Sequence, residues 1–97
     1  MKKHSILTDD WEHCFICGRF CYHPHEHHIF NGPLRKISEK YGFKVPLCYD
    51  HHNNPACPDA VHFNATIAKM LKQEAQKEFE KKHGHDAFMN LIGRNYL

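Results

Sequence analysis

The longest regular pattern of apolar residues lies in the second half of the chain. Apolar side chains recur there at every fourth residue, at Ile67, Leu71, Ala75 and Phe79. This spacing places them on one face of a helix and is typical of a helix that packs on a core. Asp59 is a suitable N-cap and Gly84 a suitable stop, so we predict a helix over residues 60–83.

The first half of the chain has shorter patterns. Residues 26–30 end in apolar, β-forming side chains and are followed by Asn-Gly-Pro, which predicts a strand that stops there. Residues 34–41 carry apolar side chains at helical spacing before Gly42 and predict a short helix. Residues 43–48 begin with apolar–polar alternation and predict a second strand, in which Pro46 favours an edge position.

The remaining segments predict one helical turn and a loop over residues 49–58, and a last helix capped by Asp86 and running to Ile92. The order of the elements indicates an α+β fold. Residues 1–97 are enough for a single domain, and 41% hydrophobic with 25% charged residues is ordinary for a folded protein. Because so short a chain buries little core, a metal ion that ties distant segments together is a common remedy.

Five cysteines would suit either disulfides or metal binding. The N-terminal segment carries Lys2 and Lys3 but no apolar stretch like that of a signal peptide, and no segment approaches the ~20 apolar residues of a membrane span. We therefore expect the protein in a reducing cytoplasm, where paired cysteine and histidine residues indicate metal ligands.

Two ligand pairs are separated by about 30 residues. A C-x2-C pair and a C-x2-H pair supply four ligands: Cys14, Cys17, Cys48 and His51. Two thiolate-rich pairs that meet in space suit a closed, tetrahedral structural zinc site. The alternative is that the cysteines are simply buried and the spacing is accidental. Cys21 could replace Cys17, whereas Cys57 lies in a proline-flanked loop and is more typical of a packed or partly exposed thiol.

A second constellation is the doublet His27 and His28 together with His52, in a chain that has 11 histidines. Neighbouring side chains on a strand point to opposite faces, so the doublet can serve two roles. One imidazole can hold a metal ion while the other accepts a proton from water, and phosphodiester cleavage needs both functions. The alternative is a histidine-rich surface strand.

The order C-x2-C, then EHHI, then LC-x2-HHN over residues 14–63 resembles the HNH, or ββα-metal, endonucleases. In that family a β-hairpin and a helix hold one divalent cation, and many members add a zinc knuckle. The segments SEKYG, VHFN and GRNYL are similar to those of small phage and prophage proteins related to recombination-associated HNH nucleases. The resemblance implies a zinc-stapled ββα-metal core with additional helices. It also implies a phage- or prophage-encoded, metal-dependent DNA endonuclease, a hydrolase acting in the cytoplasm of a bacterial host.

The same resemblance assigns roles to individual residues. It makes His28 the general base, and makes His27 and His52 ligands of a catalytic Mg²⁺ or Mn²⁺. The family's middle asparagine has only Asn31 as a counterpart in the connecting segment, and Asn31 follows the doublet more closely than the motif requires. At the third position of the predicted long helix, His62 is a further candidate ligand, with a surface histidine as the equal alternative.

The formal net charge is only +2, so any basic surface is local. Four cations around the predicted strands could contact a DNA backbone without reading its sequence: Arg35, Lys36, Lys40 and Lys44. A solvated helix face is the alternative, and the Lys2 and Lys3 arm is another path for DNA. Two other functions stay open: a non-catalytic zinc-binding nucleic-acid module, and an accessory factor that acts with recombination or packaging proteins of a phage.

Overall fold

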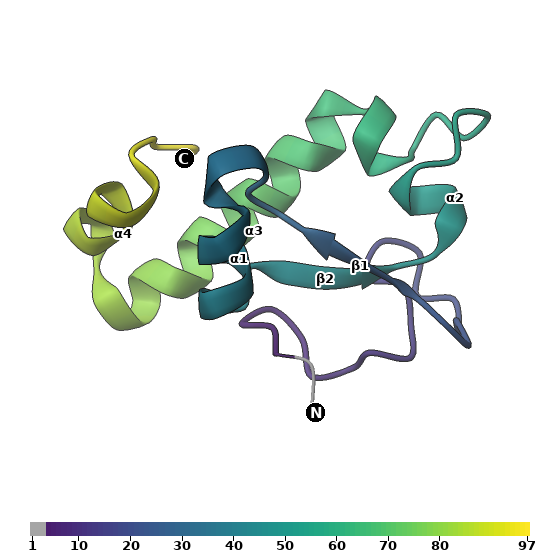
Figure 1. Cartoon of the computed structure of the whole chain (residues 1–97), viewed down its shortest axis with the longest axis horizontal. Helices are drawn as coiled ribbons and strands as arrows, with labels where there is room; N and C mark the ends of the chain where they lie inside the picture. Colours follow the sequence, from purple (N-terminus) through teal and green to yellow (C-terminus); the bar gives the residue numbers. More distant parts are fainter. Residues whose placement is uncertain (1–3) are drawn as a thin grey trace.

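The computed structural model describes residues 4–97 and shows an α+β fold with a two-stranded antiparallel sheet and four α-helices (Figure 1). In chain order the elements are β1 (His25–His28), the 3-10 turn η1 (Gly32–Leu34), α1 (Arg35–Tyr41), β2 (Lys44–Leu47), α2 (Tyr49–His52), the 3-10 turn η2 (Val61–Phe63), α3 (Ala65–His83) and α4 (His85–Ile92). The predicted sequence of elements and the α+β class are confirmed.

The hairpin sorts its side chains between two faces. Strands β1 and β2 pair so that His27 lies opposite Val45 and His28 lies opposite Lys44. Because successive strand residues point to opposite sides, His25 and His27 share one face. Glu26 and His28 share the other face with Lys44. This register decides which residues can meet at each site.

The N-terminal segment forms a tight knuckle against β2. His13 and Phe20 form an isolated antiparallel bridge, and the turn between them closes with the amide of Gly18 donating to the carbonyl of Cys14 (2.8 Å). Gly18 has a φ of +74°, which a side chain would disfavour. The knuckle is joined to the outer edge of β2 because the Phe15 amide donates to the carbonyl of Pro46 (2.8 Å). Pro46 therefore lies in a strand whose second edge is only partly paired, as its missing N–H requires.

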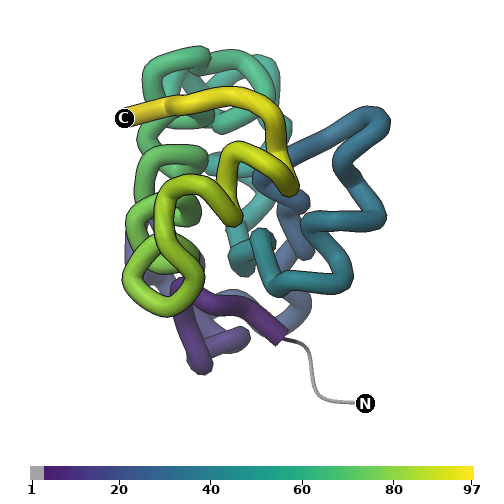
Figure 2. Tube along the Cα trace, turned by 90° about the vertical axis from the view of Figure 1, so that its left-hand side faces the viewer, coloured from purple at the N-terminus to yellow at the C-terminus, as the bar shows by residue number. Residues whose placement is uncertain are grey.

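The core lies between the far end of the hairpin, α1 and the pair α3–α4. Phe30 contacts Phe43 edge-on (ring centroids 5.2 Å apart), and Phe43 contacts Phe79 of α3 (5.7 Å). The predicted stripe on α3 is confirmed, because Leu71, Ala75 and Phe79 are buried. Figures 1 and 2 show the C-terminal tail returning alongside α3.

Two predicted helix caps were wrong. The long helix begins at Ala65 rather than after Asp59, and its cap is Asn64, whose side chain accepts hydrogen bonds from the amides of Thr66 and Ile67. Asparagine caps a helix about as well as aspartate does. The last helix begins at His85, one residue before the predicted cap Asp86, which lies in its first turn.

Candidate metal centres

The structure brings the four predicted zinc ligands together. One donor atom from each of Cys14, Cys17, Cys48 and His51 lies within 4.8 Å of the others, and we call this group the zinc cluster. The knuckle supplies the first pair, and the junction of β2 with α2 supplies the second. Cys48 directly follows β2 and is the N-cap residue of α2, so one helical turn carries His51 back beside it. The four residues could bind a metal ion such as zinc.

The distances fit a tetrahedral ion. The sulfurs of Cys17 and Cys48 are 3.9 Å apart, and the Cys48 sulfur is 3.2 Å from Nδ1 of His51. Zinc–sulfur bonds of about 2.3 Å at tetrahedral angles place two sulfurs about 3.8 Å apart. Burial, together with the smaller effect of the neighbouring Cys14, raises the pKa of the Cys48 thiol to about 12. The raised pKa means that the thiolate form of Cys48 is disfavoured when no cation is nearby. A zinc ion bound to the sulfur would stabilise the thiolate, so the donor set suits zinc.

The two other described cysteines lie outside the zinc cluster. Cys21 is half-buried, and its thiol donates to the carbonyl of Arg19 (3.5 Å), so it does not replace Cys17. Cys57 is half-buried in the loop after α2, as its proline-flanked position predicts.

A second group of possible ligands is formed by His27, His52 and His62, which we call the histidine trio. One ring nitrogen from each lies within 4.8 Å of the others, and Nε2 of His52 is 3.1 Å from Nε2 of His62. The three residues come from three elements, since β1, α2 and η2 supply one each. His27 is buried, His52 is half-buried and His62 is exposed, so the trio opens to solvent at one side.

The trio is electrically suited to bind a cation. Burial, together with the smaller effects of the neighbouring rings of His52 and His62, lowers the pKa of His27 to about 3. Burial likewise lowers the pKa of His52 to about 4, with His62 and His25 adding to the effect. Both rings are therefore neutral near pH 7, and a neutral imidazole is the form that binds metals.

His25 orients one member of the trio. Its Nδ1 atom is 2.8 Å from Nδ1 of His52, so one of these two nitrogens carries the shared proton. With the proton on His52, Nε2 of His52 keeps its lone pair and faces His62. Metal-bound histidines commonly hold their second nitrogen by such a bond.

The structure places His62 in a different element from the one that the sequence predicted. It lies in the 3-10 turn η2, before the cap of α3, and not in the first turn of the long helix. The argument from the helix dipole therefore does not apply to it. Its position next to His52 arises instead because the loop after α2 folds back on itself.

His28 lies on the other face of β1, away from the trio. Its Nε2 is 2.7 Å from a carboxylate oxygen of Glu39 on α1, and the ring is buried. Glu39 also accepts a hydrogen bond from Lys44 (2.8 Å), and Lys44 is paired with Glu26 as well. Glu26, His28 and Glu39 form a third group of close donors, but the Lys44 ammonium already provides a positive charge there.

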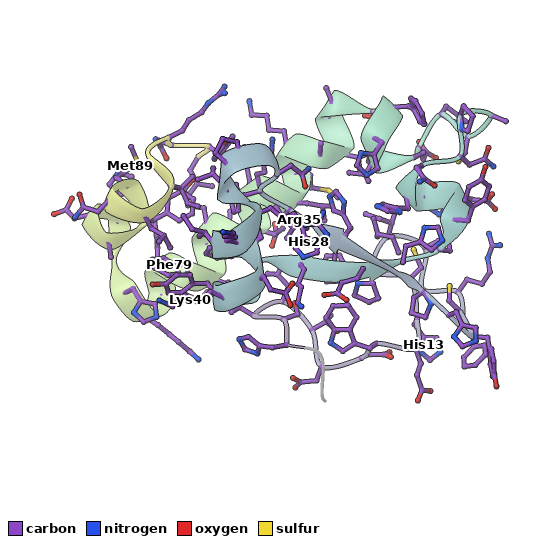
Figure 3. All side chains as sticks on the ribbon, viewed as in Figure 1. His13, His28, Arg35, Lys40, Phe79 and Met89 are labelled. Carbon is purple, nitrogen blue, oxygen red and sulfur yellow. The ribbon has the colours of Figure 1, made fainter. Side chains whose placement is uncertain are left out.

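Of the four basic residues that could contact DNA, three are exposed to solvent and one is buried. Arg35, Lys36 and Lys40 are exposed on α1, and Figure 3 shows Arg35 and Lys40 towards opposite ends of that helix. Lys44 does not belong with them, because its side chain is only 5% exposed and is held by two carboxylates. Strand alternation turns it inward, beside His28. Lys2 and Lys3 lie outside the described residues.

A pocket of about 400 Å³ lies directly beside the trio. Its lining includes His27, His62, the exposed Asn31 and Phe63, and Lys72 of α3. The Asn31 side chain makes no hydrogen bond as the cap of η1, so its amide is available to the pocket. Sequence reasoning missed Lys72 and Glu39. Glu39 lies one helical turn from Arg35, but nothing in its local pattern points to His28.

No protein family model, no curated protein and no solved structure matches this chain. Across residues 4–97, no helix combines the length and apolar character needed to cross a lipid bilayer.

Proposed function

We propose that this protein is a metal-dependent endonuclease that hydrolyses phosphodiester bonds in DNA. The observation that carries the proposal is the histidine trio, in which three imidazoles converge beside an open pocket. Three protein ligands with one open position are typical of catalytic metal sites, whereas structural sites are closed by four. The zinc cluster supplies that second, closed type of site in the same chain.

The donor set favours a transition metal. Mg²⁺ prefers oxygen ligands, whereas imidazole suits ions such as Mn²⁺ and Zn²⁺. Among the two ions implied by the family resemblance, we therefore propose Mn²⁺ over Mg²⁺. A bound ion of this kind acts as a Lewis acid on a phosphate oxygen and makes a bound water more acidic.

In this proposal His27, His52 and His62 hold the ion, and His25 fixes the ring of His52. His28 remains the proposed general base. If Glu39 accepts the proton on Nε2 of His28, the Nδ1 lone pair is left free to accept a proton from water. The rings of His27 and His28 leave opposite faces of β1, but their Cα atoms are about 3.8 Å apart. A phosphate lying across the outer edge of β1 is the arrangement that would reach both.

Plasmid cleavage with added Mn²⁺, Mg²⁺ or Zn²⁺ tests the proposal, using native protein, His62→Ala and His28→Ala. We expect cleavage by the native chain, with at least a hundredfold loss in each variant. His85→Ala is a matched control, because His85 is exposed on α4 and belongs to none of the three donor groups. Zinc content should be unchanged in all three variants, since none removes a zinc-cluster ligand.

A second function, that of a non-catalytic nucleic-acid-binding module, is favoured by one contact. His25 lies 2.8 Å from His52, and a modest ring movement would let it complete a closed, four-coordinate site. A native chain that binds two metal ions and DNA but cuts nothing under any metal would support this module and contradict the nuclease. Recombination or packaging proteins would then be its partners.

A further inference from the structure

A second pocket adjoins the pocket beside the histidine trio, along α3. The second pocket, also about 400 Å³, is bounded by α3 and the C-terminal tail. Both pockets share Ala65, Ala68 and Lys72 in their walls. We call the combined hollow the α3 groove, and it leads from the trio to the C-terminal tail, which Figure 2 shows running alongside α3.

The α3 groove is positively charged. Lys69, Lys72 and Arg94 line it, and no aspartate or glutamate of the described chain does. None of these three cations forms an ion pair within residues 4–97. Lys72 and Arg94 both lie over the ring of Tyr96, at 5.4 and 5.1 Å from its centroid. Lys72 also lines the pocket beside the trio together with His27 and His62.

The wall of the groove also carries an exposed aromatic ring. Phe63 follows His62 directly and is 59% exposed. Exposing such an apolar ring to water is unfavourable, and a flat partner stacked on the ring would remove that contact with water. A nucleobase is flat, and its face is free in a single strand but hidden in a duplex. Positively charged grooves with aromatic stacking residues are the usual architecture for single-strand binding.

We propose that the α3 groove binds one single-stranded segment of nucleic acid. Its phosphates run along Lys72, Lys69 and Arg94, a base stacks on Phe63, and the phosphate to be cut lies at the trio. This inference rests on the proposed function and adds the substrate's path and strandedness. It differs from the path over α1 that the sequence suggested, because Arg35 and Lys36 line neither pocket.

The test measures the affinity of the full chain, loaded with zinc but without added Mn²⁺, for a labelled single-stranded oligonucleotide across a range of salt concentrations. Replacing Lys69, Lys72 and Arg94 by glutamine should weaken binding about tenfold to hundredfold at 0.1 M salt. It should also reduce the slope of log affinity against log salt by about 2, since each phosphate contact on a single strand contributes about 0.7. The matched control replaces Arg35, Lys36 and Lys40 by glutamine and should change affinity less than about threefold.

A second pair of variants tests the stacking. Phe63→Ala should weaken single-strand binding about tenfold and leave duplex binding unchanged. Tyr22→Ala is the control, because Tyr22 is 82% exposed but lines neither pocket. If the triple variant folds poorly by thermal melting, Lys69→Gln with Arg94→Gln replaces it, since both side chains are exposed.

The outcomes separate the two proposals. A groove variant with native affinity and salt slope, or an α1 control that loses more, would overturn the groove. Equal loss of single-strand and duplex binding in Phe63→Ala would overturn the single-strand preference. A chain that binds through the groove but never cuts would overturn the nuclease and leave the groove intact. A chain that cuts normally with all three groove cations removed would overturn the groove and leave the nuclease intact.

Discussion

Removing one sulfur from the zinc cluster should unfold much of this protein. Cys48 is the most informative position, because it joins β2 to α2 as the N-cap residue of α2 and is buried. Cys48→Ser keeps the size of the side chain but removes the thiolate. The variant should lose close to one tightly bound zinc per chain, as measured by elemental analysis.

The expected loss of stability can be estimated from the net stability of a small domain and the binding energy of a structural zinc site. A domain of 97 residues has a net stability of roughly 5–15 kcal/mol, and a structural zinc site contributes about 10–16 kcal/mol of apparent binding energy. If only about 3 kcal/mol of this were realised as stability, the melting temperature would fall by about 12–24 °C. The buried serine hydroxyl would add about 1–3 kcal/mol if it found no partner.

Thermal melting followed by circular dichroism measures the shift, with and without a strong zinc chelator. Cys57→Ser is the matched control, because Cys57 is also a free, partly buried cysteine but lies outside the zinc cluster. It should keep its zinc and melt within a few degrees of the native protein. A Cys48→Ser protein with native zinc content and a native melting curve would refute the zinc cluster. A chelator that left the native melting curve unchanged would do so too.

Three further perturbations test the surroundings of the histidines. His25→Ala should weaken Mn²⁺ binding at the trio about tenfold to a hundredfold, by titration calorimetry, while the zinc content stays constant; unchanged affinity would remove His25 from the site. Lys44→Met should lower the free energy of unfolding by roughly 1–3 kcal/mol in urea and leave DNA affinity unchanged, because the ammonium serves two carboxylates inside the protein. Lys44 and then His28 lower the pKa of Glu39 below its ordinary 4.5, so the stability this carboxylate contributes is present above pH 4.5 and is lost as the pH falls through the lowered value. Glu39→Gln should therefore reduce the loss of stability as the pH falls below 4.5, and an unchanged profile would contradict the pairing.

The zinc cluster was predictable because its information is local. Each ligand pair is a three-residue spacing, and thiolates have few other uses in a small chain with unpaired cysteines. The buried face of α3 was predictable for a similar reason, since a fourfold recurrence of apolar residues has one helical interpretation. These features depend on neighbours in the sequence.

The histidine trio was only partly predictable. His27 and His52 follow from the motif, but His62 joins them because the loop after α2 turns back, and no spacing encodes that turn. Lys44 was misjudged because a cation near a strand end was assumed to face solvent. Its inward direction depends on the register with His28 and on Glu39, which comes from a helix between the strands.

The short helix α2 links the two metal centres. Within its four residues it donates His51 to the zinc cluster and the next residue, His52, to the histidine trio. Adjacent residues on one helical turn have fixed relative directions, so an ion that orders α2 at one centre also positions a ligand for the other. By thermodynamic reciprocity each ion should raise the affinity for its neighbour by the same factor. An ion bound at the zinc cluster would then control when a second ion could bind at the trio, without itself lying there.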